Sequence, residues 1–117
     1  MKTARHRIGV FDMMLTIYCG DHDELVAAVE SSRDFAPPDR EDWLAFAAHS
    51  GYRIGLFFPR QLTHGIIAHE ISHAVNYVLE HNGIVPTTSN DEMQALLHEE
   101  LHDAVYFRLK QWKVAPR

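Results

Sequence analysis

The chain has 117 residues, 46% of them apolar and 23% charged, which is enough for one hydrophobic core and too little for two. Its formal net charge of −5, with Lys and Arg scattered along the chain, excludes a basic surface suited to nucleic acid. The one cysteine, Cys19, cannot form an internal disulfide, so a metal site would use nitrogen and oxygen ligands. We therefore expect a single domain over residues 1–117 that binds no nucleic acid.

The N-terminal third is expected to form a strand, a helix and a loop. Residues 8–18 are rich in β-formers and predict a strand, whereas residues 21–31 carry an apolar stripe behind an acidic start and predict a short helix. Residues 35–42 contain two consecutive prolines and predict a loop. No stretch approaches the roughly twenty apolar residues that cross a bilayer. We expect a cytoplasmic protein without a membrane partner.

Residues 43–58 are compatible with two structures. The alanines of residues 42–49 would support a helix that stops at Gly51. Residues 52–58 instead alternate as a half-buried strand does, which favours a hairpin with Ser50-Gly51 as its two-residue turn. The alternation makes the hairpin the preferred prediction. Its inward positions would be Tyr52, Ile54, Leu56 and Phe58.

Two longer helices are expected to follow. Thr63 is a suitable N-cap for a helix that Asn82-Gly83 would end, and apolar residues recur at helical spacing between them. Residues 91–112 predict a last helix, whose buried face would consist of Met93, Leu97, Leu101, Ala104, Val105 and Leu109. The elements together predict an α+β fold, in which a small, mostly antiparallel sheet of about three strands packs on three helices.

The segment His69-Glu70-Ile71-Ser72-His73 lies in the first of these two helices. Residues four apart lie about 40° apart around a helix axis and one turn apart along it, so His69 and His73 can direct their imidazoles at one point. Glu70 is predicted at the rim of the same face, where its carboxylate can hydrogen-bond a metal-bound water. We expect His69 and His73 to be Zn²⁺ ligands and Glu70 to be the catalytic base.

A second match to the same pattern, His98-Glu99-Glu100-Leu101-His102, lies in the last helix. Beyond His102 only Asp103 could act as a ligand, because residues 104–117 contain no His, Asp, Glu or Cys. Since this match lacks an independent third ligand, we interpret it as the solvated or supporting face of a helix.

The third ligand of the first match is expected downstream, at the start of the last helix. Glu92 would complete a set of two histidines and a glutamate and leave the fourth position of the zinc to water. Asp91 and His98 are the fallback candidates. The alternative interpretation of Asp91-Glu92 is acidic capping of a helix N-terminus.

Residues 67–75 (Ile-Ala-His-Glu-Ile-Ser-His-Ala-Val) and 90–95 (Asn-Asp-Glu-Met-Gln-Ala) resemble those of small phage-encoded, uncharacterised proteins with zincin-type motifs. More distantly they resemble metallopeptidases that use two histidines and a glutamate. The resemblance covers about residues 43–97. It implies a minimal zincin-like domain, Glu92 as third ligand, a strand at residues 52–58 along the active-site cleft, and the host cytoplasm as the location. It also implies an aromatic residue shortly after Glu92, where this chain has Leu96.

These residues predict a zinc-dependent hydrolase, with a metallopeptidase as the leading class and a peptide or protein as substrate. The substrate would pair along residues 52–58 if that strand is an exposed edge. Tyr77, Tyr106 or His102 could donate to the oxyanion, and the sequence does not choose among them. The alternative is a non-catalytic zincin-fold protein of the phage accessory type that binds or inhibits a partner. Its contact surface would include the acidic residues Asp39, Glu41 and Asp42.

Overall fold

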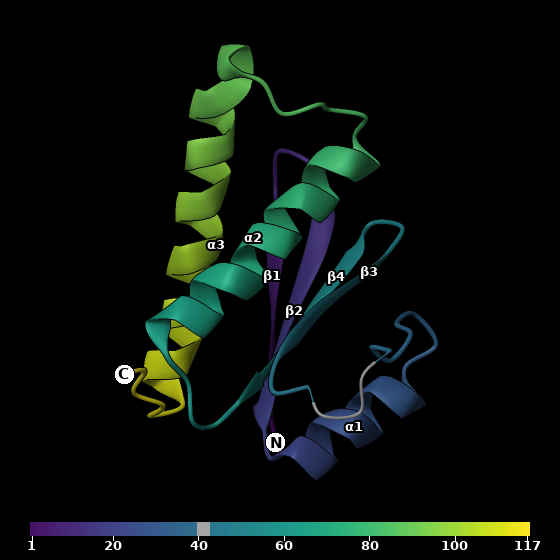
Figure 1. The fold of residues 1–117 in the computed structure, drawn as a ribbon, viewed down its shortest axis with the longest axis vertical. Coiled ribbons are helices and arrows are strands. Elements are labelled where there is room, and N and C mark those ends of the chain that lie inside the picture. The colour runs from purple at the N-terminus through teal and green to yellow at the C-terminus, as the bar shows by residue number, and fades with distance from the viewer. Residues whose placement is uncertain (40–42) are drawn as a thin grey trace.

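The computed structural model describes residues 1–39 and 43–117. The strands of this part of the chain are β1 (Lys2–Ile8), β2 (Met13–Gly20), β3 (Phe46–Ser50) and β4 (Arg53–Pro59). They form one mixed sheet in the order β1-β2-β4-β3, in which β2 and β4 are parallel and the other two pairs are antiparallel (Figure 1). The predicted α+β class is confirmed, but the sheet has four strands where about three were expected.

The N-terminal segment contains two strands, so the prediction of one strand over residues 8–18 is wrong. β1 and β2 form an antiparallel hairpin around a turn at residues 9–12, in which Asp12 has a φ of 52° and accepts a hydrogen bond from Arg7. Most side chains of β1 are polar and exposed, as suits a strand at the edge of a sheet. A polar edge strand lacks the apolar alternation by which a strand is detected in a sequence.

The hairpin predicted within residues 43–58 is confirmed, and the alternative helix is not formed. Its turn lies one residue later than predicted, because Ser50 pairs with Arg53 and Gly51-Tyr52 forms the connection. Gly51 has a φ of 57°, a left-handed conformation that glycine adopts without strain. Because β4 pairs with β2, the other strand of the hairpin, β3, lies at the sheet edge.

β4 is an interior strand and is covered on both faces. Phe57, which was predicted to point outward, is as deeply buried as Leu56 and Phe58. The Phe57 ring stacks between Tyr18 and Phe46 with centroid separations of 4.4 and 4.6 Å. Because helices cover both faces here, the alternation of β4 does not separate buried from exposed positions.

The helices are α1 (His22–Ser31), α2 (His64–His81) and α3 (Asp91–Gln111), with a short 3₁₀ turn, η1 (Thr88–Asn90), before α3. Their bounds agree with the predicted ranges to within one residue. Thr63 caps α2 as predicted, since its hydroxyl accepts a hydrogen bond from the Ile66 amide at 3.1 Å. Figure 1 shows α2 and α3 against one face of the sheet and α1 at the opposite end of the molecule from the start of α3.

Two apolar clusters hold these layers together. The larger lies between the sheet and α2 with α3, and the smaller lies under α1 around Phe57. Four of the six positions predicted for the buried face of α3 are fully buried, while Met93 and Ala104 are half-buried. Each buried leucine contributes roughly 1.5–3 kcal/mol, so this packing fixes the position of α2 over the sheet.

Part of the predicted loop over residues 35–42 is described by the structure. Residues 35–39 form neither helix nor strand, in agreement with the prediction, while residues 40–42 lie outside the described residues. Two of the three residues of the predicted acidic contact surface, Glu41 and Asp42, are among the latter. In the described ranges, no helix is both long enough and apolar enough to cross a membrane.

Candidate metal centre

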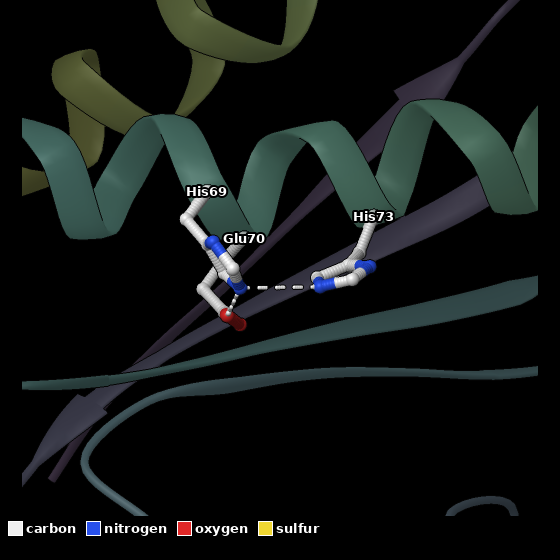
Figure 2. A group of neighbouring side chains, drawn as sticks. All are labelled: His69, Glu70 and His73. Atoms are coloured by element: carbon white, nitrogen blue, oxygen red, sulfur yellow. Dashed lines mark hydrogen bonds and ion pairs between the residues drawn. The ribbon is translucent and has the colours of Figure 1, made fainter.

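His69, Glu70 and His73 project together from the N-terminal half of α2 (Figure 2). The Nε2 atoms of His69 and His73 are 3.3 Å apart, and Nε2 of His69 is 3.7 Å from Oε1 of Glu70. One possible ligand atom from each side chain falls within 4.8 Å of the others. The convergence of the two imidazoles that the spacing predicts is therefore present in the structure.

The three side chains differ sharply in exposure. The His69 side chain is 69% exposed and His73 is also exposed, whereas the Glu70 side chain is 7% exposed. On the helix, Glu70 lies between the histidines and the buried stripe of Ile67, Ile71 and Ala74. The predicted rim position for Glu70 is therefore wrong, because its carboxylate is buried between α2 and the sheet.

The burial of Glu70 leaves its carboxylate short of hydrogen-bond partners. Oε2 is fully buried and has no partner among the described residues. Burial raises the pKa of Glu70, and the nearby His69 and His73 oppose that rise. An unpaired buried acceptor is expensive, typically about 1–3 kcal/mol, and a native protein that retains one commonly has a use for it.

The cluster opens into a pocket of about 940 Å³. One wall is the start of α2, and the opposite wall comes from the described residues on either side of 40–42. The lining residues besides the cluster are Pro38, Asp39, Trp43, Leu44, Ala45, Phe46, Thr63, Gly65 and Ile66. This volume is in the range of small-molecule and peptide side-chain sites.

A second, smaller hollow of about 310 Å³ continues from the cluster along β3. Glu70 and His73 line it together with Tyr77 of α2 and residues 46–49 of β3. The Tyr77 hydroxyl donates a hydrogen bond to the Ala47 carbonyl at 3.2 Å, and the Tyr77 ring stacks on His49 at 4.0 Å. These two contacts tie the helix that carries the histidines to the edge strand.

The donor set fits a zinc ion. Two imidazole nitrogens that bind one tetrahedral zinc at about 2.0–2.1 Å are about 3.4 Å apart, and the observed separation is 3.3 Å. Nitrogen and carboxylate oxygen are the ligand types that zinc takes where thiolates are absent. The carboxylate of Glu70 offers an oxygen atom, Oε1, at 3.7 Å from Nε2 of His69.

Glu92, the predicted third ligand, does not join this group. It lies exposed in the first turn of α3, and Figure 1 shows that turn beyond the C-terminal end of α2. In Figure 2 the three side chains of the cluster point away from α3 and toward the strands. Asp91 shares the position of Glu92 in that first turn, where both suit the acidic-cap interpretation.

The second histidine pattern forms no comparable cluster in the described residues. Nδ1 of His102 is 2.7 Å from the carbonyl oxygen of His98, so this ring donates to its own helix. The His98 and His102 rings are 6.2 Å apart, and burial together with His102 lowers the pKa of His98. Neither His98 nor His102 therefore contributes a ligand to the α2 cluster.

Of the candidate oxyanion donors, Tyr77 lines a hollow beside the cluster, whereas Tyr106 and His102 do not. Tyr77 lies next to the cluster, but its hydroxyl proton is engaged by Ala47. The Tyr106 hydroxyl is 2.6 Å from Nδ1 of His64 and lines neither hollow beside the cluster.

The residues that form the pocket wall were not predicted from the sequence. Trp43 lines the larger hollow and His49 the smaller one, but no motif in the sequence marks either residue as part of a site. Their signals were weak, because a wall contributed by a loop and an edge strand has no motif spacing. Only the hairpin prediction placed residues 43–49 next to β4.

Comparisons with models of known protein families, with curated proteins and with solved structures found no match for this chain. The likeness of residues 67–75 and 90–95 to small phage-encoded zincin-type proteins stays a prediction from the sequence.

Proposed function

We propose that this protein is a zinc-dependent hydrolase, with peptide bonds as its substrate class. The observation that carries the proposal is the juxtaposition in Figure 2: a buried carboxylate with an unpartnered oxygen stands beside two imidazole nitrogens 3.3 Å apart. His69 and His73 hold the metal, and Glu70 serves as the general base. A minimal zincin-like arrangement of helix and edge strand is part of this proposal.

When bound, zinc supplies Lewis acidity, lowering the pKa of water toward about 7 and polarising a carbonyl group. Glu70 accepts the proton from the attacking water through Oε1, the oxygen that lies 3.7 Å from Nε2 of His69. Burial raises the pKa of Glu70 toward the pH of a reaction near pH 7, and a general base works best when its pKa is close to that pH.

Asp39 is the third protein ligand in this proposal. It carries the only carboxylate other than Glu70 among the described residues that line the pocket. Asp39 and Glu92 both lie outside the group of His69, Glu70 and His73, but Asp39 lines the pocket and Glu92, at the start of α3, does not. Two imidazoles and one carboxylate leave the fourth position of a tetrahedral zinc open, as catalysis requires.

β3 is the strand along which a peptide substrate would extend. Pairing along residues 52–58 required that strand to be an exposed edge, but β4 lies between β2 and β3, and β3 is the terminal strand of the sheet. The 310 Å³ hollow follows β3 from the cluster toward His49. An extended peptide there would gain main-chain hydrogen bonds from the outer edge of β3, the side away from β4, and bring its backbone to Glu70.

The test is peptide hydrolysis by the zinc-loaded protein and by Glu70→Gln, with a mixed peptide library analysed by mass spectrometry. Glu70→Gln should keep zinc and lose activity by about 10²–10⁴-fold, the usual contribution of a general base. The matched control is Glu99→Gln, which changes the equivalent position of the second pattern on an exposed face of α3. It should retain full activity.

A wild-type protein that binds zinc but cleaves no peptide would contradict the proposal. Full cellular function in Glu70→Gln would do so too, and would favour the alternative class of a non-catalytic binding protein. Equal losses in Glu70→Gln and Glu99→Gln would show that the activity does not belong to the α2 cluster.

A further inference from the structure

A hollow of about 770 Å³, distinct from the two beside the cluster, lies on the other face of the sheet. Side chains alternate along β2, so that Leu15 and Ile17 are buried under α2 and α3 while Thr16 and Tyr18 face the opposite side. Thr16 and Tyr18 line this hollow. It is therefore separated from His69 and His73 by the sheet itself.

Arginines from three separate elements converge on this hollow: Arg5 of β1, Arg53 of β4 and Arg33 after α1. Arg5 pairs in register with Thr16 and Arg53 with Met14, so the two strands that flank β2 each contribute one guanidinium. Three of the chain's eleven Lys and Arg are gathered here, in a protein whose net charge is −5. The local charge is opposite to that of the whole molecule.

The acidic side chain in the lining neutralises only one of these charges. Asp34 accepts a hydrogen bond from Arg53 at 2.6 Å, and Arg53 also donates to the Tyr52 hydroxyl at 3.3 Å. Arg5 and Arg33 have no carboxylate partner within residues 1–39 and 43–117. Within those ranges, the guanidinium groups of Arg5 and Arg33 are therefore not compensated by a carboxylate.

Neutral hydrogen-bonding groups complete the lining. The Tyr18 phenol is half-buried on the floor, where burial raises its pKa and the nearby Arg5 and Arg53 oppose that rise. Thr16 adds a hydroxyl beside it. A planar guanidinium matches phosphate or carboxylate through two parallel hydrogen bonds, and hydroxyls satisfy the remaining oxygens.

We propose that this hollow is a second binding site and that it takes a small phosphate monoester. The guanidiniums of Arg5 and Arg33, which pair with no carboxylate of the described residues, match the two negative charges of a monoester, and the volume accommodates an organic group of the size of a small metabolite. The ring of Tyr18 offers an apolar surface for that group. The inference is independent of the hydrolase proposal, because no residue of the α2 cluster lines the hollow.

The experiment is a titration of the full chain, treated with a chelator, by isothermal calorimetry and amide NMR. The probes are phenyl phosphate, inorganic phosphate and succinate. Phenyl phosphate should bind saturably and shift amide signals of β1, β2 and β4 near Thr16. Inorganic phosphate should bind more weakly at the same residues, and succinate should be the weakest of the three.

Arg5→Gln and Arg33→Gln should each weaken phenyl phosphate binding about tenfold, the loss expected for one charge-assisted contact. Arg7→Gln is the matched control, because Arg7 lies on the same strand and pairs with Asp12 outside the hollow. It should bind like the wild type. Arg5→Lys keeps the charge but loses the two parallel N–H donors of the guanidinium, so this variant should bind with intermediate affinity.

Three outcomes would overturn the proposal. One is no saturable binding of phenyl phosphate up to about 10 mM, ten times a dissociation constant of about 1 mM. Another is an equal loss of affinity in Arg5→Gln and Arg7→Gln, which would indicate unspecific attraction. Tighter binding of succinate than of phenyl phosphate would assign the hollow to dicarboxylates instead.

Discussion

Two helices of this chain carry the same spacing of His, Glu and His, and they place those side chains differently. In α2 the Nε2 atoms of His69 and His73 approach to 3.3 Å, and the ring centroids are 4.9 Å apart. In α3 the rings of His98 and His102 are 6.2 Å apart, and His102 bonds to the backbone of its own helix. Identical spacing thus permits convergence of the imidazoles but does not produce it.

The glutamates show the larger difference. Glu70 lies against the sheet with 5% exposure, beside walls formed by β3 and by described residues of the preceding loop. Glu99 is exposed on α3. A carboxylate becomes a candidate base when burial raises its pKa and leaves it without partners, and only the surroundings of α2 do this.

The strongest test compares how histidine substitutions in α2 and in α3 change the zinc affinity of the protein. His69→Ala should lower zinc affinity by more than about 100-fold, because even residues that only support a ligand are worth 10–100-fold. His98→Ala should leave the affinity unchanged. Competition titration with a chromogenic chelator measures both. Retained affinity in His69→Ala together with loss in His98→Ala would assign the metal to α3.

The next effect concerns the stability of the zinc-free protein. Glu70→Gln should raise the free energy of unfolding by about 1–2 kcal/mol at pH 7, because it removes a charge from a buried site without partners. Glu99→Gln, at an exposed position, should change it by less than about 0.5 kcal/mol. Urea denaturation in the presence of a chelator checks this comparison, and a destabilised Glu70→Gln protein would contradict it.

The same carboxylate predicts a pH dependence. Since burial raises the pKa of Glu70 above its value in the unfolded chain, the folded protein binds this proton more tightly. The resulting stabilisation is complete below the ordinary glutamate pKa and is lost as pH rises through the raised one. The wild type should therefore lose stability over this interval relative to Glu70→Gln. Parallel pH profiles of the two proteins would refute this assignment.

A smaller effect distinguishes two candidate third ligands. Asp39→Asn should weaken zinc binding about tenfold, since it removes the charge of one carboxylate oxygen donor, whereas Glu92→Ala should have no effect. Metal affinity measured by calorimetry decides between them. A loss confined to Glu92→Ala would mean that the start of α3 moves to the cluster when zinc binds.

The smallest effect tests the link between α2 and the edge strand. Tyr77→Phe removes the hydrogen bond to the Ala47 carbonyl and should cost about 0.5–1.5 kcal/mol of stability. Tyr106→Phe removes an exposed bond to His64 and should cost less. Thermal unfolding of the two variants compares them, and an equal loss would show that the Tyr77 contact is no stronger than a surface bond.

Much of the fold could be predicted from local signals. The helices α2 and α3 follow from apolar spacing and from caps such as Thr63, which act within one turn of the chain. The β3-β4 hairpin follows from alternation around Gly51. β1 could not be predicted, because its polar side chains carry no apolar period.

Because helix geometry is local, the spacing alone was enough to predict that His69 and His73 stand one helical turn apart with Glu70 beside them. Which of the two matching patterns becomes a cluster, and whether Glu92 can reach it, follows instead from how the elements pack. Those outcomes depend on which elements surround each helix. The sheet order that makes β3 the edge and buries Glu70 against it arises from contacts between distant residues, which no local spacing encodes.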